Sequence, residues 1–137
     1  MRIPVRVPYL RAATLLWGVY ALVWLALEGH VARDGLLAGW GVALLALWAA
    51  ARLLGGRELS TGQVVALGAA AGLAWGVALG PAVLLLMAVK TGLHAHGPEY
   101  SAAQIAAVVG QWPFWVGAGV LAGMGLGMLA LALTGDR

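Results

Sequence analysis

The sequence contains no cysteine and little charge. Of its 137 residues, 9% are charged and 63% are hydrophobic, and the mean hydropathy is +0.93. The missing cysteine excludes a disulfide scaffold, a thiol nucleophile, a cysteine metal site and an iron–sulfur cluster. Soluble domains carry roughly 25% charged residues, and a chain this short could not bury so much apolar surface in one core. The composition therefore predicts a protein whose solvent is lipid.

The few charges also exclude several classes of function. The eight Lys and Arg residues stand singly at the edges of apolar runs, which is typical of membrane-boundary anchors and not of a nucleic-acid surface. The sequence has no phosphate-binding loop and no G-x-S-x-G setting for either serine. We therefore expect neither a nucleic-acid partner nor an enzyme.

Four apolar stretches approach or exceed the roughly 20 residues that cross a bilayer as a helix. They run over about 9–27, 35–54, 64–89 and 112–133. Residues 101–111 are expected to form a short outer interfacial helix, begun by a capping box at Ser101 and Gln104. Alternatively, they form the first turns of a long fourth helix kinked at Pro113. The predicted fold is one all-α integral membrane domain over residues 1–137, a four-transmembrane-helix bundle.

The basic residues predict an orientation. With four spans, the side that holds both termini carries Arg2, Arg6, Arg11, Arg52, Arg57 and Arg137, and the other side carries Arg33 and Lys90. Because cytoplasmic loops are the more positive ones, we expect both termini in the cytoplasm. The expected location is the inner membrane of a bacterium.

Glycine recurs every four residues along the third and fourth spans. The two series are Gly68, Gly72, Gly76 and Gly80, and Gly119, Gly123 and Gly127. This spacing places the glycines in one stripe, where two helix backbones approach closely. A chain with 21 glycines contains some such pairs by chance, but four in register favour a glycine zipper that packs helices within the chain or between subunits.

The third span contains a predicted kink or hinge. At about 1.5 Å per residue, 64–89 exceeds the roughly 30 Å hydrocarbon core, so this helix must tilt or bend. Pro81, preceded by Gly80, has no N–H to donate to the carbonyl of Val77.

No ionisable residue lies near the middle of any predicted span. Ion-coupled transporters, proton relays and voltage sensors place such groups at that depth, so their classes are disfavoured. Small four-span multidrug exporters of this size use a carboxylate in their first span, whereas Glu28 follows the first apolar run here.

The histidines gather on the predicted outer side. His30, His94 and His96, with Glu99, have side chains that suit a transition metal. The alternative is that these are ordinary polar loop residues, since they lack a ligand-pair spacing. No other cofactor is expected.

We therefore expect a small non-enzymatic membrane protein that acts as an accessory, assembly or stabilising subunit and packs through its glycine stripes. Its expected partners are the lipid bilayer and other membrane subunits or a second copy of itself. The alternatives are a small transporter or channel for an apolar or weakly polar solute, and an outer-face metal binder.

Overall fold

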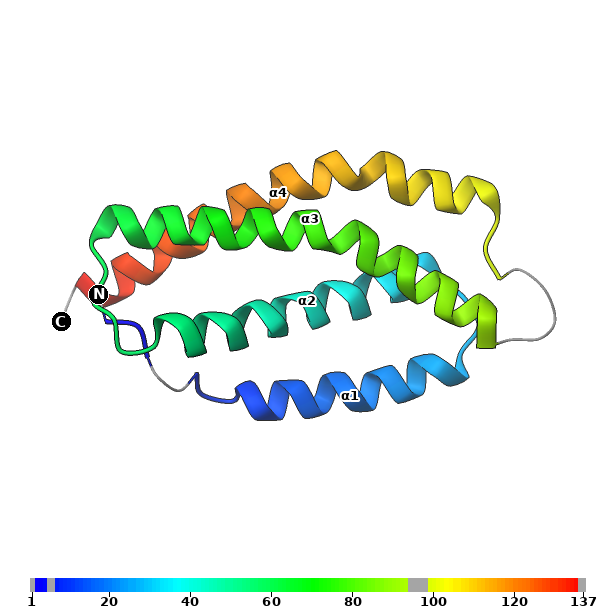
Figure 1. Ribbon diagram of the computed structural model, residues 1–137, viewed down its shortest axis with the longest axis horizontal. Helices are drawn as coiled ribbons and strands as arrows, with labels where there is room; N and C mark the ends of the chain where they lie inside the picture. The colour runs from blue at the N-terminus through cyan, green and yellow to red at the C-terminus, as the bar shows by residue number, and fades with distance from the viewer. Residues whose placement is uncertain (1, 5–6, 94–98, 136–137) are drawn as a thin grey trace.

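The structure is a computed structural model that describes residues 2–4, 7–93 and 99–135. In that part of the chain, four helices follow one another: α1 (Leu10–Ala26), α2 (Val31–Leu54), α3 (Thr61–Leu93) and α4 (Ala102–Gly135) (Figure 1). The last three are long and apolar enough to cross a membrane, and α1 is a shorter apolar helix of 17 residues. The prediction of an all-α, multi-pass membrane protein is confirmed at this level.

The prediction of a separate interfacial helix is wrong. Helix α4 runs without a break from Ala102 through Pro113 to Gly135, so residues 102–111 are its first turns. The predicted capping box is present, because the Ser101 amide donates to Gln104 Oε1 at 2.8 Å and the Gln104 amide donates to Ser101 Oγ at 3.2 Å. Pro113 lacks one amide hydrogen but does not end a helix that is already well started.

The two ends of the molecule differ in what they carry. The segment that begins at Arg2 and the last turns of α4 lie at one end, the terminal end, together with the α2–α3 connection (Figure 1). There the amide of Ile3 donates to the Arg57 carbonyl, and the amide of Gly56 donates to the Ile3 carbonyl, both at 2.9 Å. The opposite end, the loop end, holds the α1–α2 and α3–α4 connections. Because the described chain begins and finishes at the same end, its four helices alternate in direction.

The helices form an open arrangement. Viewed down the shortest axis of the molecule, α1, α2 and α3 follow one another, while α4 crosses behind α3 so that its last turns appear between α3 and α2 (Figure 1), and the main packing is between consecutive helices. The accessible surface is 8751 Å², whereas a compact 14.0 kDa chain would expose about 6,700 Å². The molecule therefore exposes more surface than a compact chain of its mass, although a buried cluster of Ala38, Leu79, Val83, Met87 and Val108 joins α2, α3 and α4.

Helices α3 and α4 make the closest contact in the molecule, and glycine provides it. A Cβ on Gly72 would overlap the carbonyl oxygen of Gly119, and one on Gly68 would overlap that of Gly123. A Cβ on Gly76 would lie 2.7 Å from the Val116 Cα. The structure thus brings the two glycine series together inside one chain.

Indole N–H groups join each pair of neighbouring helices. Trp17 on α1 donates to the Leu37 carbonyl on α2 at 2.9 Å, and Trp75 on α3 donates to the Gly39 carbonyl on α2 at 2.9 Å. Trp112 on α4 donates to the Val77 carbonyl on α3 at 3.1 Å. Since lipid offers no competing water, each of these bonds fixes one helix against the next.

The Trp112 bond falls at the proline of α3. Pro81 lies inside that helix and cannot donate to the carbonyl four residues earlier, which is that of Val77. The Trp112 indole donates to this same carbonyl. Gly80 makes room for the indole, because a Cβ there would lie 3.0 Å from Trp112 Cγ. A side chain of the neighbouring helix thus donates to the carbonyl that Pro81 leaves without a hydrogen bond, and a backbone group inside a membrane needs such a partner.

Replacing Gly72 by Ala is expected to destabilise the fold by about 1–3 kcal/mol, because α3 and α4 must separate to accept the new methyl group. Gly117 on α4 is the matched control, since a Cβ there meets nothing within 4 Å. Unfolding in detergent, followed by circular dichroism, measures both variants. Equal stability of the two would contradict the assigned contact.

Replacing Trp112 by Phe is expected to cost about 1–3 kcal/mol, because it leaves the Val77 carbonyl without its second-helix donor. In a Pro81→Ala background the amide of residue 81 supplies a donor, so the cost of Trp112→Phe should fall. Trp75→Phe serves as the control, since its acceptor on Gly39 is unrelated to the proline. The same cost of Trp112→Phe in both backgrounds would overturn this interpretation.

Candidate functional site

A group of buried polar side chains lies at the loop end. This polar cluster comprises Trp24, Asp34, Lys90, Glu99 and Tyr100, which come from α1, α2, α3 and the α3–α4 connection. Asp34 and Lys90 are both 0% exposed. Because ionisable groups buried in a membrane protein are costly to retain, such a cluster is a candidate functional site.

Trp24 connects the two buried charges. Its indole N–H donates to Asp34 Oδ1 at 2.7 Å, and its backbone carbonyl accepts a hydrogen bond from Lys90 Nζ. The Lys90 ammonium also lies 4.4 Å from the centroid of the Trp24 ring, in a cation–π contact. One residue of α1 thereby ties together the first turn of α2 and the last turn of α3.

The α3–α4 connection closes over the α1–α2 turn. Glu99 Oε2 accepts a hydrogen bond from the amide of Gly29, and a Cβ on Gly29 would lie 2.9 Å from Tyr100 Cζ. The turn between α1 and α2 therefore needs glycine at this position. Tyr100 is 6% exposed, although it lies outside the helices.

The Tyr100 hydroxyl lies beside the Asp34 carboxylate and the His30 backbone in the polar cluster. Burial first, and then the neighbouring carboxylates of Asp34 and Glu99, raise the pKa of the Tyr100 hydroxyl above its usual value of 10.0. Tyr100 therefore keeps its proton and remains a hydrogen-bond donor beside the Asp34 carboxylate.

Sequence reasoning placed Asp34 and Lys90 in outer loops and missed the polar cluster. The signal lay in helical spacing. Lys90 continues the stripe of Leu79, Val83 and Met87, all of which are buried, at intervals of three and four residues. Asp34 is likewise the first member of a buried stripe on α2. Helix α2 begins at Val31, one turn before the predicted span, which brings Asp34 inside it.

The predicted metal ligands are only partly placed. His30 is exposed where α2 begins, and Glu99 reaches the adjacent Gly29, while His94 and His96 lie outside the described residues. Within residues 2–4, 7–93 and 99–135, no three His, Cys, Asp or Glu side chains come together as metal ligands. The metal site therefore stays a prediction, and so does a hinge at Pro81.

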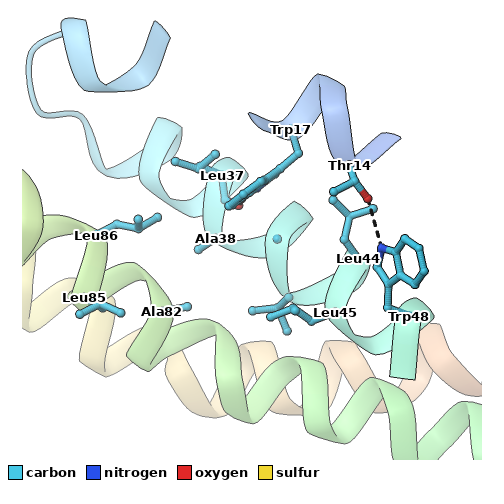
Figure 2. Close-up of a pocket in the computed structure, with 12 residues that line it drawn as sticks. Thr14, Trp17, Leu37, Ala38, Leu44, Leu45, Trp48, Ala82, Leu85 and Leu86 are labelled. Atoms are coloured by element: carbon cyan, nitrogen blue, oxygen red, sulfur yellow. Dashed lines mark hydrogen bonds between the residues drawn. The ribbon is translucent and has the colours of Figure 1, made fainter. Parts of the chain in front are cut away.

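A second candidate site is an apolar groove between α1, α2 and α3, with a volume of about 260 Å³. Figure 2 shows Thr14 and Trp17 on α1 near Leu44 and Trp48 on α2, with Ala82 of α3 on the opposite side. The Trp48 indole donates to Thr14 Oγ1 at 3.2 Å, and that hydroxyl donates to the Leu10 carbonyl at 2.8 Å. Since these polar groups are already bonded, the groove offers a ligand mainly hydrocarbon.

Comparison of the chain with protein-family models, with curated proteins and with solved structures finds no match. The fold and its apolar helices nonetheless define a class. This is a small multi-pass helical membrane protein, with a buried polar cluster at one end and an apolar groove among its first three helices.

The polar cluster makes a double-mutant prediction. Asp34→Asn keeps an acceptor oxygen for Trp24 but removes the negative charge, and Lys90→Met removes the buried cation that binds the same tryptophan. Each variant should destabilise the protein. The double variant should be more stable than the sum of the two effects implies, by about 0.5–3 kcal/mol, because it removes both charges.

Chemical unfolding in detergent, followed by circular dichroism, provides the free energies. Arg33→Met is the matched control at the same end, because among the described residues the Arg33 side chain donates to the Glu28 carbonyl, at 3.0 Å, and not to the polar cluster. Its effect should add to that of Asp34→Asn without coupling. Additivity in the Asp34–Lys90 pair would show that the two charges do not depend on each other.

Proposed function

We propose that the protein is a non-enzymatic accessory subunit that packs against a different membrane protein through the outer face of α4. The observation that carries the proposal is a second set of glycines on this helix. Gly110, Gly117 and Gly125 have nothing within 4 Å of an added Cβ, whereas Gly119 and Gly123 contact α3. Helix α4 therefore has one set of glycines packed against α3 and a second set that faces away from the other described helices.

Large exposed side chains alternate with these open glycines. Phe114 and Leu121, which are 74% and 72% exposed, lie on either side of Gly117, and Met128 follows Gly125. The order is Gly110, Phe114, Gly117, Leu121, Gly125 and Met128. Intervals of three and four residues align them as one seam of projections and gaps, which suits a second transmembrane helix.

The size of the molecular surface supports the same role. The protein exposes roughly 2,000 Å² more than a compact chain of this mass, whereas a standard protein interface uses about 800 Å² from each partner. Room for a partner thus remains beside the surface that lipid covers.

A transporter of an apolar solute is the alternative function, with Pro81 as its hinge. The contacts at the proline favour the accessory role, because Trp112 holds the Val77 carbonyl and packs against Gly80. An ion pathway is also disfavoured, since Trp24 engages both Asp34 and Lys90 at the loop end.

The proposal includes an orientation with both termini in the cytoplasm of a bacterium. Four arginines are exposed at the terminal end, namely Arg2, Arg11, Arg52 and Arg57. Lys90, by contrast, is fully buried at the loop end, which leaves Arg33 as the basic residue facing outward among those described. This asymmetry supports the positive-inside assignment.

The test is purification from native membranes in mild detergent, followed by native mass measurement. We expect a stoichiometric foreign membrane protein to remain bound. Gly117→Leu should release that partner, because leucine fills the gap between Phe114 and Leu121, while the melting temperature of the isolated protein stays unchanged. Gly18→Leu on α1 is the control, since its Cβ position is equally open.

Retention of the partner by Gly18→Leu and its loss in Gly117→Leu would support the α4 interface. A monomer or a homo-oligomer without a foreign partner would contradict the accessory function.

A further inference from the structure

Gln111 is an exposed polar side chain on α4, and the packing of α4 against α3 gives its depth in the membrane. The α3 segment 64–89 has no polar side chain, so this segment should centre on the hydrocarbon core. Gly76 stands at the middle of the segment, and a Cβ on it would lie 2.5 Å from the Trp115 carbonyl oxygen of α4. Trp115 is therefore close to the level of the middle of the membrane.

This register places Gln111 inside the hydrocarbon core. It precedes Trp115 by four residues, which is about 6 Å along a helix, whereas half of the core is about 15 Å. No described residue forms a hydrogen bond with the Gln111 side chain. An amide without a hydrogen-bond partner in an apolar medium is costly, and acyl chains cannot provide one. The Gln111 amide therefore needs a partner from outside the described chain.

Gln104, seven residues earlier on α4, shows the difference between a bonded amide and an open one. Its Oε1 accepts hydrogen bonds from the Ser101 amide at 2.8 Å and from the Ser101 hydroxyl at 3.1 Å. The indole N–H groups of Trp75 and Trp112 likewise donate to carbonyls of a neighbouring helix. Gln111 has no such contact within the described residues.

A backbone group at the same level has the same need. Pro113 cannot donate to the carbonyl of Val109, which lies four residues earlier in α4. Val109 is 49% exposed, and no described side chain donates to its carbonyl. In α3, the carbonyl that Pro81 leaves receives the Trp112 indole from the neighbouring helix. The same arrangement in α4 indicates a neighbouring helix that is not among the described ones.

We propose that the membrane protein bound to α4 carries a hydroxyl or amide side chain that forms a hydrogen bond with Gln111 inside the membrane. This inference rests on the proposed function and names the chemistry of the partner. Gln111 borders the seam of open glycines, because it lies three residues before Phe114 and is its neighbour on the helix surface. The partner group is uncharged, because α4 has no charged residue to pair with an ion at this depth. An amide both donates and accepts, so Ser, Thr, Asn or Gln would satisfy it.

The first test is Gln111→Met, which keeps the length of the side chain and removes its amide. Native mass measurement over a dilution series of the complex from native membranes should show an affinity for the partner that is about 3- to 30-fold lower. That range corresponds to about 0.6–2 kcal/mol for an interhelical hydrogen bond. The melting temperature of the isolated protein should not fall, because no bond within the described chain is lost. Gln104→Met is the matched control and should keep the affinity, since that amide already bonds to Ser101.

The second test identifies what lies against Gln111. Photoreactive benzoylphenylalanine replaces Gln111 in the full chain, the native membranes are irradiated, and mass spectrometry locates the cross-link. We expect it on a transmembrane helix of a foreign protein, within one turn of a Ser, Thr, Asn or Gln. The same probe in place of Leu16, an exposed residue of α1, is the control and should react with lipid.

The outcomes separate this inference from the proposed function. If a foreign protein copurifies but binds wild type and Gln111→Met equally, the hydrogen bond is refuted and the accessory function stands. A cross-link from position 111 to lipid, to a second copy of the chain, or to a helix without such a polar residue likewise refutes the inference. If no foreign protein copurifies, both the inference and the accessory function fail.

Discussion

Lipid does not drive apolar helices together, so every helix contact in this protein needs another source of attraction. Two devices provide it. Glycine lets the backbones of α3 and α4 meet directly, as at Gly72 and Gly119, and dispersion forces then act over a close surface. Tryptophan supplies hydrogen bonds from one helix to the next wherever bulkier side chains keep the backbones apart. The positions of both sites follow from these contacts.

The two ends of the molecule use tryptophan differently. At the loop end, Trp24 forms hydrogen bonds with the buried Asp34 and Lys90, and Tyr100 is buried beside them. At the terminal end, the Trp48 indole donates to Thr14, and Trp48 and Arg11 line an open cavity. One end is therefore closed by internal bonds, while the other holds an open cavity.

Much of this fold could be predicted from the sequence, but the sites could not. Apolar length and the Ser101 capping box locate helices, because these signals are local. The burial of Lys90 depends on Trp24, which is 66 residues away, and no local rule predicts that partner. The hydrogen bond from Trp112 to the Val77 carbonyl is a second example. The sequence shows that Pro81 leaves this carbonyl without its helical donor, but it does not show that Trp112 replaces that donor. The groove depends on how three helices diverge, which spacing does not determine.

An open arrangement of helices also has a consequence for how the chain is made. Each helix packs chiefly against the one synthesised just before it, so most helix contacts form without a distant segment, whereas the contacts of Lys90 with Trp24 and of Glu99 with Gly29 form later. As each helix leaves the insertion machinery, its neighbour is already in the bilayer, and Trp75 meets Gly39 as soon as α3 enters. Helix α4 is inserted last, and it forms the most extensive contact, with α3. The helices should therefore assemble in the order of translation, and the packing of α4 against α3 should complete the fold.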